Sequence, residues 1–183
     1  MKYDEFYVES IRDPKGFWKR QAQNLIWDDF PTEILREAPH GGSHWFADGR
    51  LNMSYLCIDR HLEAGHGDQV AIYYDSPVTQ VKANITYQQL KDEVSKLAGG
   101  LKKLGLEKGD TAIVYMPMIP QAIYAMLACA RLGVIHSVVF GGFAPHELAI
   151  RIDDCRPKVI ITASNGVEIS KIIPYKPFVD EAI

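Results

Sequence analysis

From residue 70 onward, apolar residues recur at the spacings of alternating strands and helices. Residues 70–74 read Val-Ala-Ile-Tyr-Tyr and predict a strand, with a turn at 75–77. Apolar residues at positions 90, 94, 97, 101 and 104 follow at intervals of 4, 3, 4 and 3, which places them on one helix face. Thr86 and Gln89 predict a capping box at the helix start, and Gly105 predicts the helix end because glycine tolerates the left-handed conformation.

The same alternation continues along the rest of the chain. Pro120 and Pro145 each begin a helical pattern, at a position where the missing backbone donor costs nothing. The order βαβαβαβ predicts an α/β fold, with parallel strands joined by right-handed crossovers and helices on both faces of the sheet. The predicted strands are 84–85, 111–115, 134–140 and 159–163, and the helices run from 87 to about 104, from 120 to 132 and from 145 to about 154.

Three loops follow the carboxyl ends of these strands, which is where ligands bind in open parallel sheets. They are residues 116–119, 140–144 and 164–171. The paired glycines Gly141 and Gly142 permit close approach of a ligand to the backbone, and the helix that follows offers free amide donors to an anion. The alternative is a tight strand-to-helix turn without a ligand.

The last of these loops contains a turn dipeptide and a cation. Asn165-Gly166 predicts a turn, and the ammonium group of Lys171 suits a phosphate. The alternative is a solvated loop with a surface lysine. The loop at 116–119 is stiffened by two prolines, and structural rigidity is the simpler interpretation of it.

The first seventy residues have no long periodic pattern. They are rich in Trp, His and Asp, and their aromatic residues are typical of an extended, partly helical segment that wraps on another surface and makes no core alone. We therefore predict two regions, a wrapping segment over 1–69 and the α/β region over 70–183. The aromatic residues concerned are Phe17, Trp18, Trp27, Phe30, Trp45 and Phe46.

Composition excludes several classes of protein. The 183 residues carry 20 Lys plus Arg against 23 Asp plus Glu, so the net charge of −3 argues against a strongly basic nucleic-acid binder. The longest apolar run, residues 122–130, is far shorter than the ~20 residues of a membrane-spanning helix. Because the first ten residues lack a signal-peptide core and an Arg-rich transit pattern, we expect a cytoplasmic protein, with the mitochondrial matrix as the alternative.

Common catalytic and metal-binding patterns are missing from the sequence. There is no G-x-x-x-x-G-K-[ST] phosphate loop, no G-x-G-x-x-G fingerprint and no G-x-S-x-G nucleophile elbow. Cys57, Cys129 and Cys155 lack zinc-site spacing and are predicted to be buried free thiols in a reducing compartment. His136 stands among apolar residues and is predicted to be a core histidine. We predict no catalytic and no metal-ligating residue.

Several runs carry a specific resemblance. Tyr-Met-Pro-Met-Ile-Pro at 115–120, Ala-Met-Leu-Ala-Cys-Ala-Arg-Leu-Gly at 125–133 and His-Ser-Val-Val-Phe-Gly-Gly-Phe at 136–143 resemble the AMP-forming short-chain acyl-CoA synthetases. Residues 151–160 continue the similarity, and residues 45–62 resemble the segment that opens these proteins. The similarity covers essentially the whole chain and implies the N-terminal part of the acyl-adenylate-forming large domain.

Within this family the chain looks more like the propionyl-CoA than the acetyl-CoA synthetases. The runs concerned are Tyr-Asp-Ser-Pro-Val-Thr at 74–79, Gly-Val-Glu at 166–168 and Pro-Tyr-Lys-Pro at 174–177. The acetyl branch typically carries an arginine-bearing G-V-R-x-G-R loop at the second of these places. The resemblance therefore favours propionate as the substrate, with acetate next.

The resemblance also implies a reaction and its cofactors. A carboxylate attacks ATP to give an acyl-adenylate and pyrophosphate, and the thiol of coenzyme A then displaces AMP, with Mg²⁺ neutralising phosphate charge. The family's Pro-Lys-Gly phosphate loop, aromatic substrate-pocket motif, ribose-binding aspartate and adenylation lysine have no counterpart in these residues. We therefore expect an N-terminal fragment that is inactive alone and self-associates through its incomplete sheet. The alternative is a free-standing, non-catalytic module that binds CoA or a nucleotide.

Part of the family's CoA site does have counterparts here. Phe140, Gly141 and Gly142 match the loop beside the CoA adenine, and residues 168–171 match the loop that meets the nucleotide phosphates. Glu168 and Lys171 stand where the acetyl branch has arginines, so phosphate binding through this loop would rely on Lys171. The CoA-binding residues implied by the resemblance are Phe140, Gly141, Gly142, Glu168, Ile169, Ser170 and Lys171.

Overall fold

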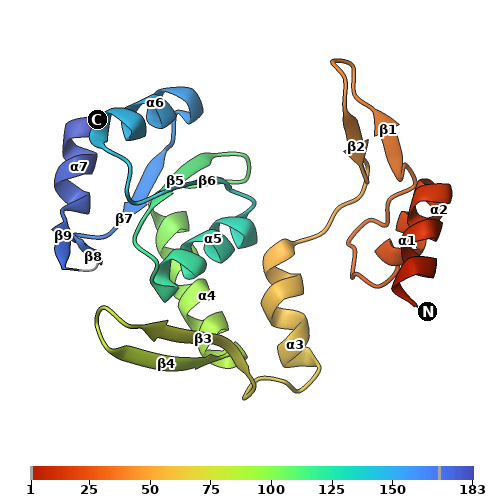
Figure 1. Cartoon of the computed structure of the whole chain (residues 1–183), viewed down its shortest axis with the longest axis horizontal. Coiled ribbons are helices and arrows are strands. Elements are labelled where there is room, and N and C mark those ends of the chain that lie inside the picture. The colour runs from red at the N-terminus through yellow and green to blue at the C-terminus, as the bar shows by residue number, and fades with distance from the viewer. Residues whose placement is uncertain (1, 169) are drawn as a thin grey trace. The chain divides into compact units, whose positions relative to one another are not determined.

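The chain divides into two compact units in the computed structural model, which describes residues 2–168 and 170–183. The units are Met1–Asn52 and Met53–Ile183 (Figure 1). Within the second unit, the π-helix η1 (Tyr55–Asp59) and the short α3 (Arg60–Glu63) pack against α4 (Tyr87–Lys103). Asp59 accepts a 2.6 Å hydrogen bond from Arg131 of α5 (Pro120–Leu132). The compact units divide between Asn52 and Met53, before η1, whereas the sequence predicts a functional boundary after residue 69. That functional boundary stays a prediction.

The first unit contains two helices and a two-stranded hairpin. The helices are α1 (Tyr3–Arg12) and α2 (Pro14–Ala22), and the strands β1 (Leu35–Glu37) and β2 (Ser43–Trp45) pair antiparallel. Asp13 caps α2 by accepting a hydrogen bond from the Gly16 amide at 3.0 Å, with Pro14 as the first helical residue. The Asp48 carboxylate accepts bonds from the Thr32 hydroxyl and from two backbone amides, which lowers the pKa of Asp48 to about 2.

Aromatic rings contact one another in a series along the first unit. Phe17 is 1% exposed and meets the edges of Phe6 and Trp18 at centroid distances of 4.7 and 5.2 Å. Further ring contacts connect Trp18, Trp45, Phe46, Trp27 and Phe30 in that order. Trp18, Trp45 and Phe30 are still 41–44% exposed, so the expectation that this segment wraps on another surface stays a prediction.

The second unit contains a three-stranded parallel sheet. Its strands are β5 (Thr111–Tyr115), β6 (Ile135–Val139) and β7 (Val159–Thr162) in the order β6-β5-β7, with Ile113 opposite Ser137 and Ile160. The helices are α4 (Tyr87–Lys103), α5 (Pro120–Leu132), α6 (Pro145–Cys155) and α7 (Tyr175–Ala182). These elements confirm the predicted α/β class and the predicted parallel strands at 111–115, 134–140 and 159–163.

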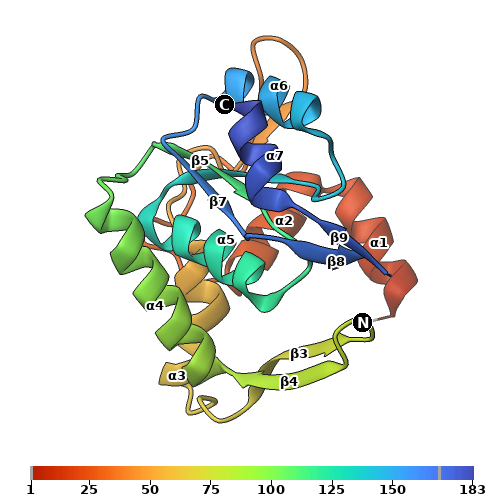
Figure 2. The ribbon, with the colours of Figure 1, turned by 90° about the vertical axis from the view of Figure 1, so that its left-hand side faces the viewer.

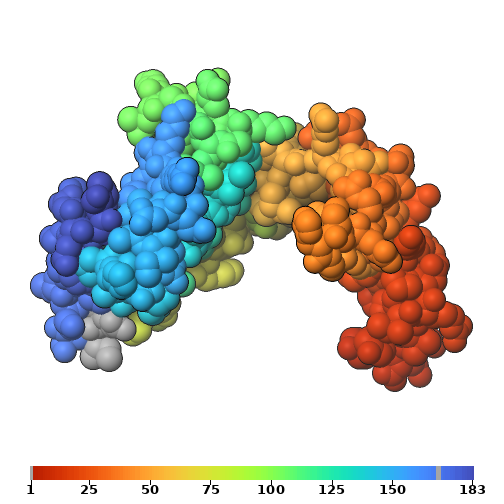
Figure 3. Space-filling view, turned by 90° about the horizontal axis from the view of Figure 1, so that it is seen from above, coloured from red at the N-terminus to blue at the C-terminus, as the bar shows by residue number. Residues whose placement is uncertain are grey.

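Helices cover both faces of this sheet (Figure 1 and Figure 2). Alternate residues of β5 point to opposite faces, so Ala112 packs with buried residues of α4 and α5, and Ile113 and Tyr115 pack with residues of α6 and α7. Helices α6 and α7 lie side by side, and Figure 3 shows their surface in two shades of blue. The core of the unit is therefore two clusters, one on each side of the strands.

The expected caps are present. The Gln89 amide donates to the Thr86 hydroxyl at 3.2 Å, and the Gln89 side chain accepts from the Thr86 amide at 2.9 Å, which confirms the capping box. Gly105 and Gly133 follow α4 and α5 with φ values of 86° and 72°. Both are left-handed conformations that glycine adopts without strain.

Two hairpins differ from the sequence-based expectation. β3 (Val70–Ser76) and β4 (Val81–Thr86) pair antiparallel as a separate ribbon, so the strand expected at 84–85 is not a member of the parallel sheet. The connection between them is only four residues long, which suits an antiparallel hairpin and is too short for a parallel crossover. A second hairpin, β8 (Gly166–Glu168) and β9 (Lys171–Ile173), occupies the predicted loop at 164–171.

The parallel sheet has two open margins within the described residues. β6 and β7 are its outer strands, and Ile135 and Val138 of β6 are 62% and 56% exposed. Edge strands of this kind present unpaired backbone groups and apolar side chains to any further strand. The bare sheet margin expected from the sequence is therefore present. No helix in the described ranges is long and apolar enough to cross a membrane.

Candidate functional site

The predicted ligand loops meet at the carboxyl edge of the parallel sheet. Residues 116–119 follow β5, residues 140–144 follow β6, and residues 163–165 follow β7. Phe140 is 65% exposed and Gly142 is exposed, whereas Gly141 between them is buried. The loop after β6 thus presents one aromatic side chain to solvent and turns one glycine inward.

Tyr115, the last residue of β5, is hydrogen-bonded to the backbone of this loop. Its ring is fully buried, and its hydroxyl donates to the carbonyl oxygens of Phe143 at 2.8 Å and Gly141 at 3.5 Å. Burial raises the pKa of the Tyr115 hydroxyl, so it stays a protonated donor at neutral pH. Sequence reasoning missed this residue. The available signal was a hydroxyl-bearing ring at the end of an otherwise apolar strand, since a buried Tyr needs a hydrogen-bond partner.

Beside the loop, the Phe143 ring contacts both the Phe140 ring and the Arg151 guanidinium group. The Phe140 ring meets the Phe143 ring edge-on at 5.7 Å, and the Arg151 guanidinium carbon lies 4.4 Å from the centre of the Phe143 ring. Arg151 is held by its own helix, where it donates to the Glu147 carbonyl at 2.7 Å and to the Glu147 carboxylate at 3.3 Å. A cation over Phe143 stabilises that ring in place, and the Phe140 ring next to it stays accessible.

Tyr175, the first residue of α7, brings the two predicted loops together. A Cβ added to Gly141 would lie 1.8 Å from the Tyr175 hydroxyl oxygen, and one added to Gly166 would lie 2.7 Å from the same ring. The ring also packs on Tyr115 at a centroid distance of 4.9 Å. The glycine at 141 is therefore needed for the close approach of Tyr175 to the backbone, a role that the ligand and turn interpretations did not include.

The expected turn at Asn165-Gly166 is wrong. Gly166 is buried, begins β8 and lacks the left-handed φ that such a turn requires. Its missing Cβ makes room for the Tyr175 ring and for Pro117, whose Cβ would be 3.1 Å away. Packing against a ring, and not backbone freedom, explains this glycine.

The β8–β9 hairpin carries the second set of predicted residues. Gly166 pairs with Ile173 at the end near Tyr175, and Glu168 pairs with Lys171 at the other end. Ser170 and Lys171 are exposed, and Ile169 lies outside the described residues. The structure therefore joins the 140–142 loop to the base of this hairpin, while Lys171 stands at its far end.

Other candidate residues have structural roles. Cys129 is buried, which raises its thiol pKa to about 11. Cys57 is exposed on η1 and Cys155 is only half-buried, so the prediction that all three thiols are buried is wrong for these two. His136 is half-buried on the outer strand β6, so it is not the core histidine that its neighbours suggested. In residues 2–168 and 170–183, no three His, Cys, Asp or Glu side chains are grouped to hold a metal ion.

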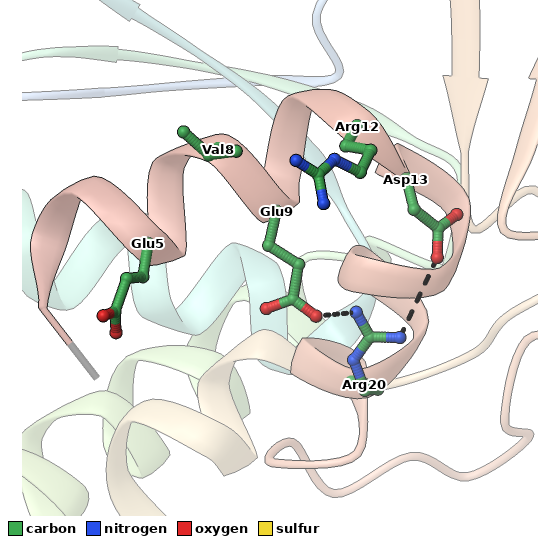
Figure 4. A pocket seen from close by; sticks show the side chains of 6 residues that line it. All are labelled: Glu5, Val8, Glu9, Arg12, Asp13 and Arg20. Carbon is green, nitrogen blue, oxygen red and sulfur yellow. Dashed lines mark hydrogen bonds and ion pairs between the residues drawn. The ribbon is translucent and has the colours of Figure 1, made fainter.

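A hollow of about 520 Å³ in the first unit lies between α1 and α2 and contains none of the predicted site residues (Figure 4). Arg20 forms ion pairs with Glu9 and, at 3.9 Å, with Asp13. All three of these side chains are at least one third exposed, so the pairs are weak and screened by solvent. We interpret the residues around this hollow as a surface ion-pair network and not as a ligand site. Its lining residues are Glu5, Val8, Glu9, Arg12, Asp13 and Arg20.

Two known protein families match the chain, one over most of each unit. The family described as AMP-binding enzyme matches residues 59–181, which is most of the second unit. The chain belongs to this family. The family described as acetyl-coenzyme A synthetase N-terminus matches residues 3–57. The resemblance read from the motifs at 115–120, 125–133 and 136–143 is thereby confirmed.

Individual relatives match over all or nearly all of the chain. An uncharacterised protein of Pseudomonas aeruginosa is 55% identical over 183 residues, which is 100% of this chain and 29% of that protein. The mitochondrial acyl-CoA synthetase short-chain family member 3 of Bos taurus is 51% identical, covering 100% of this chain and 26% of its own. The acetyl-coenzyme A synthetase of Streptomyces avermitilis is 50% identical, covering 98% and 27%. The chain spans little more than a quarter of the length of these members of the AMP-binding family.

Proposed function

We propose that this chain is the N-terminal portion of an AMP-forming short-chain acyl-CoA synthetase and supplies part of its CoA site. The complete enzyme would convert a short-chain carboxylate, ATP and CoA to acyl-CoA, AMP and pyrophosphate. Family membership and the relatives named as acyl-CoA and acetyl-CoA synthetases support the reaction class. The substrates are small molecules, and the proposal includes no nucleic acid and no membrane.

One observation carries the assignment of the CoA site. The Phe140 loop and the base of the β8–β9 hairpin lie against the same ring, Tyr175, at the carboxyl edge of the sheet. An exposed aromatic ring suits the adenine of CoA, because every purine offers a face for stacking. An exposed ammonium at Lys171 suits its phosphates. We assign CoA contacts to Phe140, Gly142, Ser170 and Lys171, and retain Gly141, Glu168 and Ile169 on the resemblance alone.

The residues of this chain suit some of the molecules in the family reaction better than others. The exposed ring and lysine fit CoA as described. For Mg²⁺ the described residues hold no cluster of ligating side chains, so we assign the ion no residue in this chain. We also assign no residue to ATP, since the family's phosphate loop and adenylation lysine have no counterpart in these 183 residues.

We propose propionate as the preferred substrate, with acetate next. The support is local, from residues 74–79, 166–168 and 174–177, which look like the propionyl branch. The identities to the acyl-CoA synthetase of Bos taurus and the acetyl-coenzyme A synthetase of Streptomyces avermitilis are nearly equal, at 51% and 50%, so overall identity adds no support for one substrate. A cytoplasmic location stays a prediction, with the mitochondrial matrix as its alternative.

The 183 residues alone are expected to show no ATP–pyrophosphate exchange with propionate or acetate. Adenylation needs a group that stabilises the α-phosphate as pyrophosphate leaves, and the family motifs for this step are missing from these residues. The measurement is incorporation of labelled pyrophosphate into ATP, with the Streptomyces avermitilis synthetase as the positive control. Exchange by the purified 183 residues above the enzyme-free background would contradict the proposal.

A free-standing CoA-binding module is the second candidate. It is supported by the two core clusters, one on each face of the parallel sheet. Calorimetric titration distinguishes the two: micromolar affinity for CoA favours a module, and affinity in the millimolar range favours a partial site.

A further inference from the structure

We propose that Tyr175 is a positioning residue that couples the 140–143 loop to the β8–β9 hairpin, so that both parts of the candidate CoA site are held by one ring. This inference rests on the proposed function for its consequence, CoA binding. Its structural content can be tested without any ligand.

The two ends of the Tyr175 side chain serve different loops. The hydroxyl oxygen and the adjoining ring carbon occupy the space beside Gly141, at 1.8 and 2.6 Å from the point where a Cβ on that residue would lie. The Cε2–Cδ2 edge occupies the space beside Gly166, at 2.7 and 3.4 Å from the corresponding point. Neither glycine accepts a side chain without displacement of the ring. The phenol is therefore a spacer whose length sets how the loop and the hairpin lie around it.

The ring itself has little freedom to move. Tyr175 is 4% exposed and lies against Tyr115, whose own hydroxyl holds the Phe143 carbonyl. Val179, one helical turn further along α7, is buried in the same cluster as Leu148 of α6. Helix α7 thus holds the ring from one side and β5 from the other. The position of the Tyr175 ring is therefore fixed, and both loops pack against it.

The proposal makes a specific prediction for two substitutions. Tyr175→Leu removes the whole phenol, so amide hydrogen exchange should become faster in both 140–143 and 166–168. Tyr175→Phe keeps the ring edge beside Gly166 and removes the hydroxyl beside Gly141, so exchange should rise more in 140–143 than in 166–168. The measurement is hydrogen exchange of the 183-residue protein, followed by mass spectrometry or NMR.

Tyr124→Leu is the matched control. Tyr124 is a buried tyrosine in the cluster on the opposite face of the sheet, so its loss lowers stability without touching either loop. It should raise exchange broadly, with no selective effect on 140–143 or 166–168. The proposal is overturned if Tyr175→Phe loosens both segments equally, or if Tyr175→Leu gives the same pattern as Tyr124→Leu.

A CoA titration of the same variants separates this inference from the proposed function. If the loops bind CoA, Tyr175→Leu should weaken binding about tenfold or more, and Tyr124→Leu should leave the affinity of the folded protein unchanged. Selective exchange in the variants combined with no CoA binding by the unaltered protein would contradict the proposed function and support the positioning role. CoA binding that is equally tight in the Tyr175→Leu and Tyr124→Leu variants would contradict the positioning role alone.

Discussion

Replacing Phe140 by alanine is expected to weaken binding of CoA by ~5- to 150-fold, because stacking of a base on an aromatic side chain contributes ~1–3 kcal/mol. The ring is 65% exposed and makes one edge contact with Phe143, so the free energy of unfolding should fall by less than about 1 kcal/mol. A large loss of affinity with a small loss of stability is characteristic of a ligand contact. The measurements are a CoA titration and a denaturant melt.

The matched control is Tyr73→Ala, which removes a ring that is 78% exposed on the β3–β4 hairpin. This substitution removes the same kind of surface but lies on the separate antiparallel ribbon, and CoA affinity should not change. Equal affinities for the Phe140→Ala and Tyr73→Ala proteins would remove Phe140 from the site.

Gly141→Ala is expected to lower the free energy of unfolding by ~1–3 kcal/mol, the usual cost of overpacking a buried position. The added Cβ would lie 1.8 Å from the Tyr175 hydroxyl oxygen, and Tyr175 is held by Tyr115 and α7. The clash cannot be relieved by moving an exposed side chain, so the ring, the loop or α7 must shift. Denaturant unfolding of the purified protein measures the change.

Gly142→Ala provides the comparison. Its Cβ would lie 2.5 Å from the far edge of the exposed Phe140 ring, which can rotate into solvent, so stability should change by no more than about 0.5 kcal/mol. Combining Gly141→Ala with Tyr175→Ala should cost less than the sum of the two single changes, because the second removes the atom that the first meets. Additive costs would contradict the close approach of the ring to Gly141.

Local signals were enough to predict most of the second unit. The start and end of α4 follow from Thr86, Gln89 and Gly105, and the start of α5 follows from Pro120, because each of these signals depends on backbone groups within one turn. The parallel strands followed from short apolar runs between helices. The position of the loops after these strands at one edge of the sheet followed in turn, since parallel strands place their carboxyl ends together.

Contacts between distant residues could not be predicted from local patterns. β3 and β4 read as strands, but their pairing with each other depended on a four-residue connection that the alternation of elements does not reveal. Gly166 was taken for a turn residue because the reason for its small size, the Tyr175 ring, lies on another element. The ring contacts among Phe17, Trp18 and Trp45 in the first unit likewise join residues from different elements, which local patterns do not reveal.

The central claim is that the 140–142 loop and the β8–β9 hairpin form one CoA-binding surface. The most direct test is an NMR titration of the labelled 183-residue protein with CoA up to millimolar concentration. The account predicts that amide shifts are confined to residues 140–143, 166–168 and 170–173, and that Lys171→Ala weakens the response in all three. Shifts that map elsewhere, or no shifts in these segments, would contradict it.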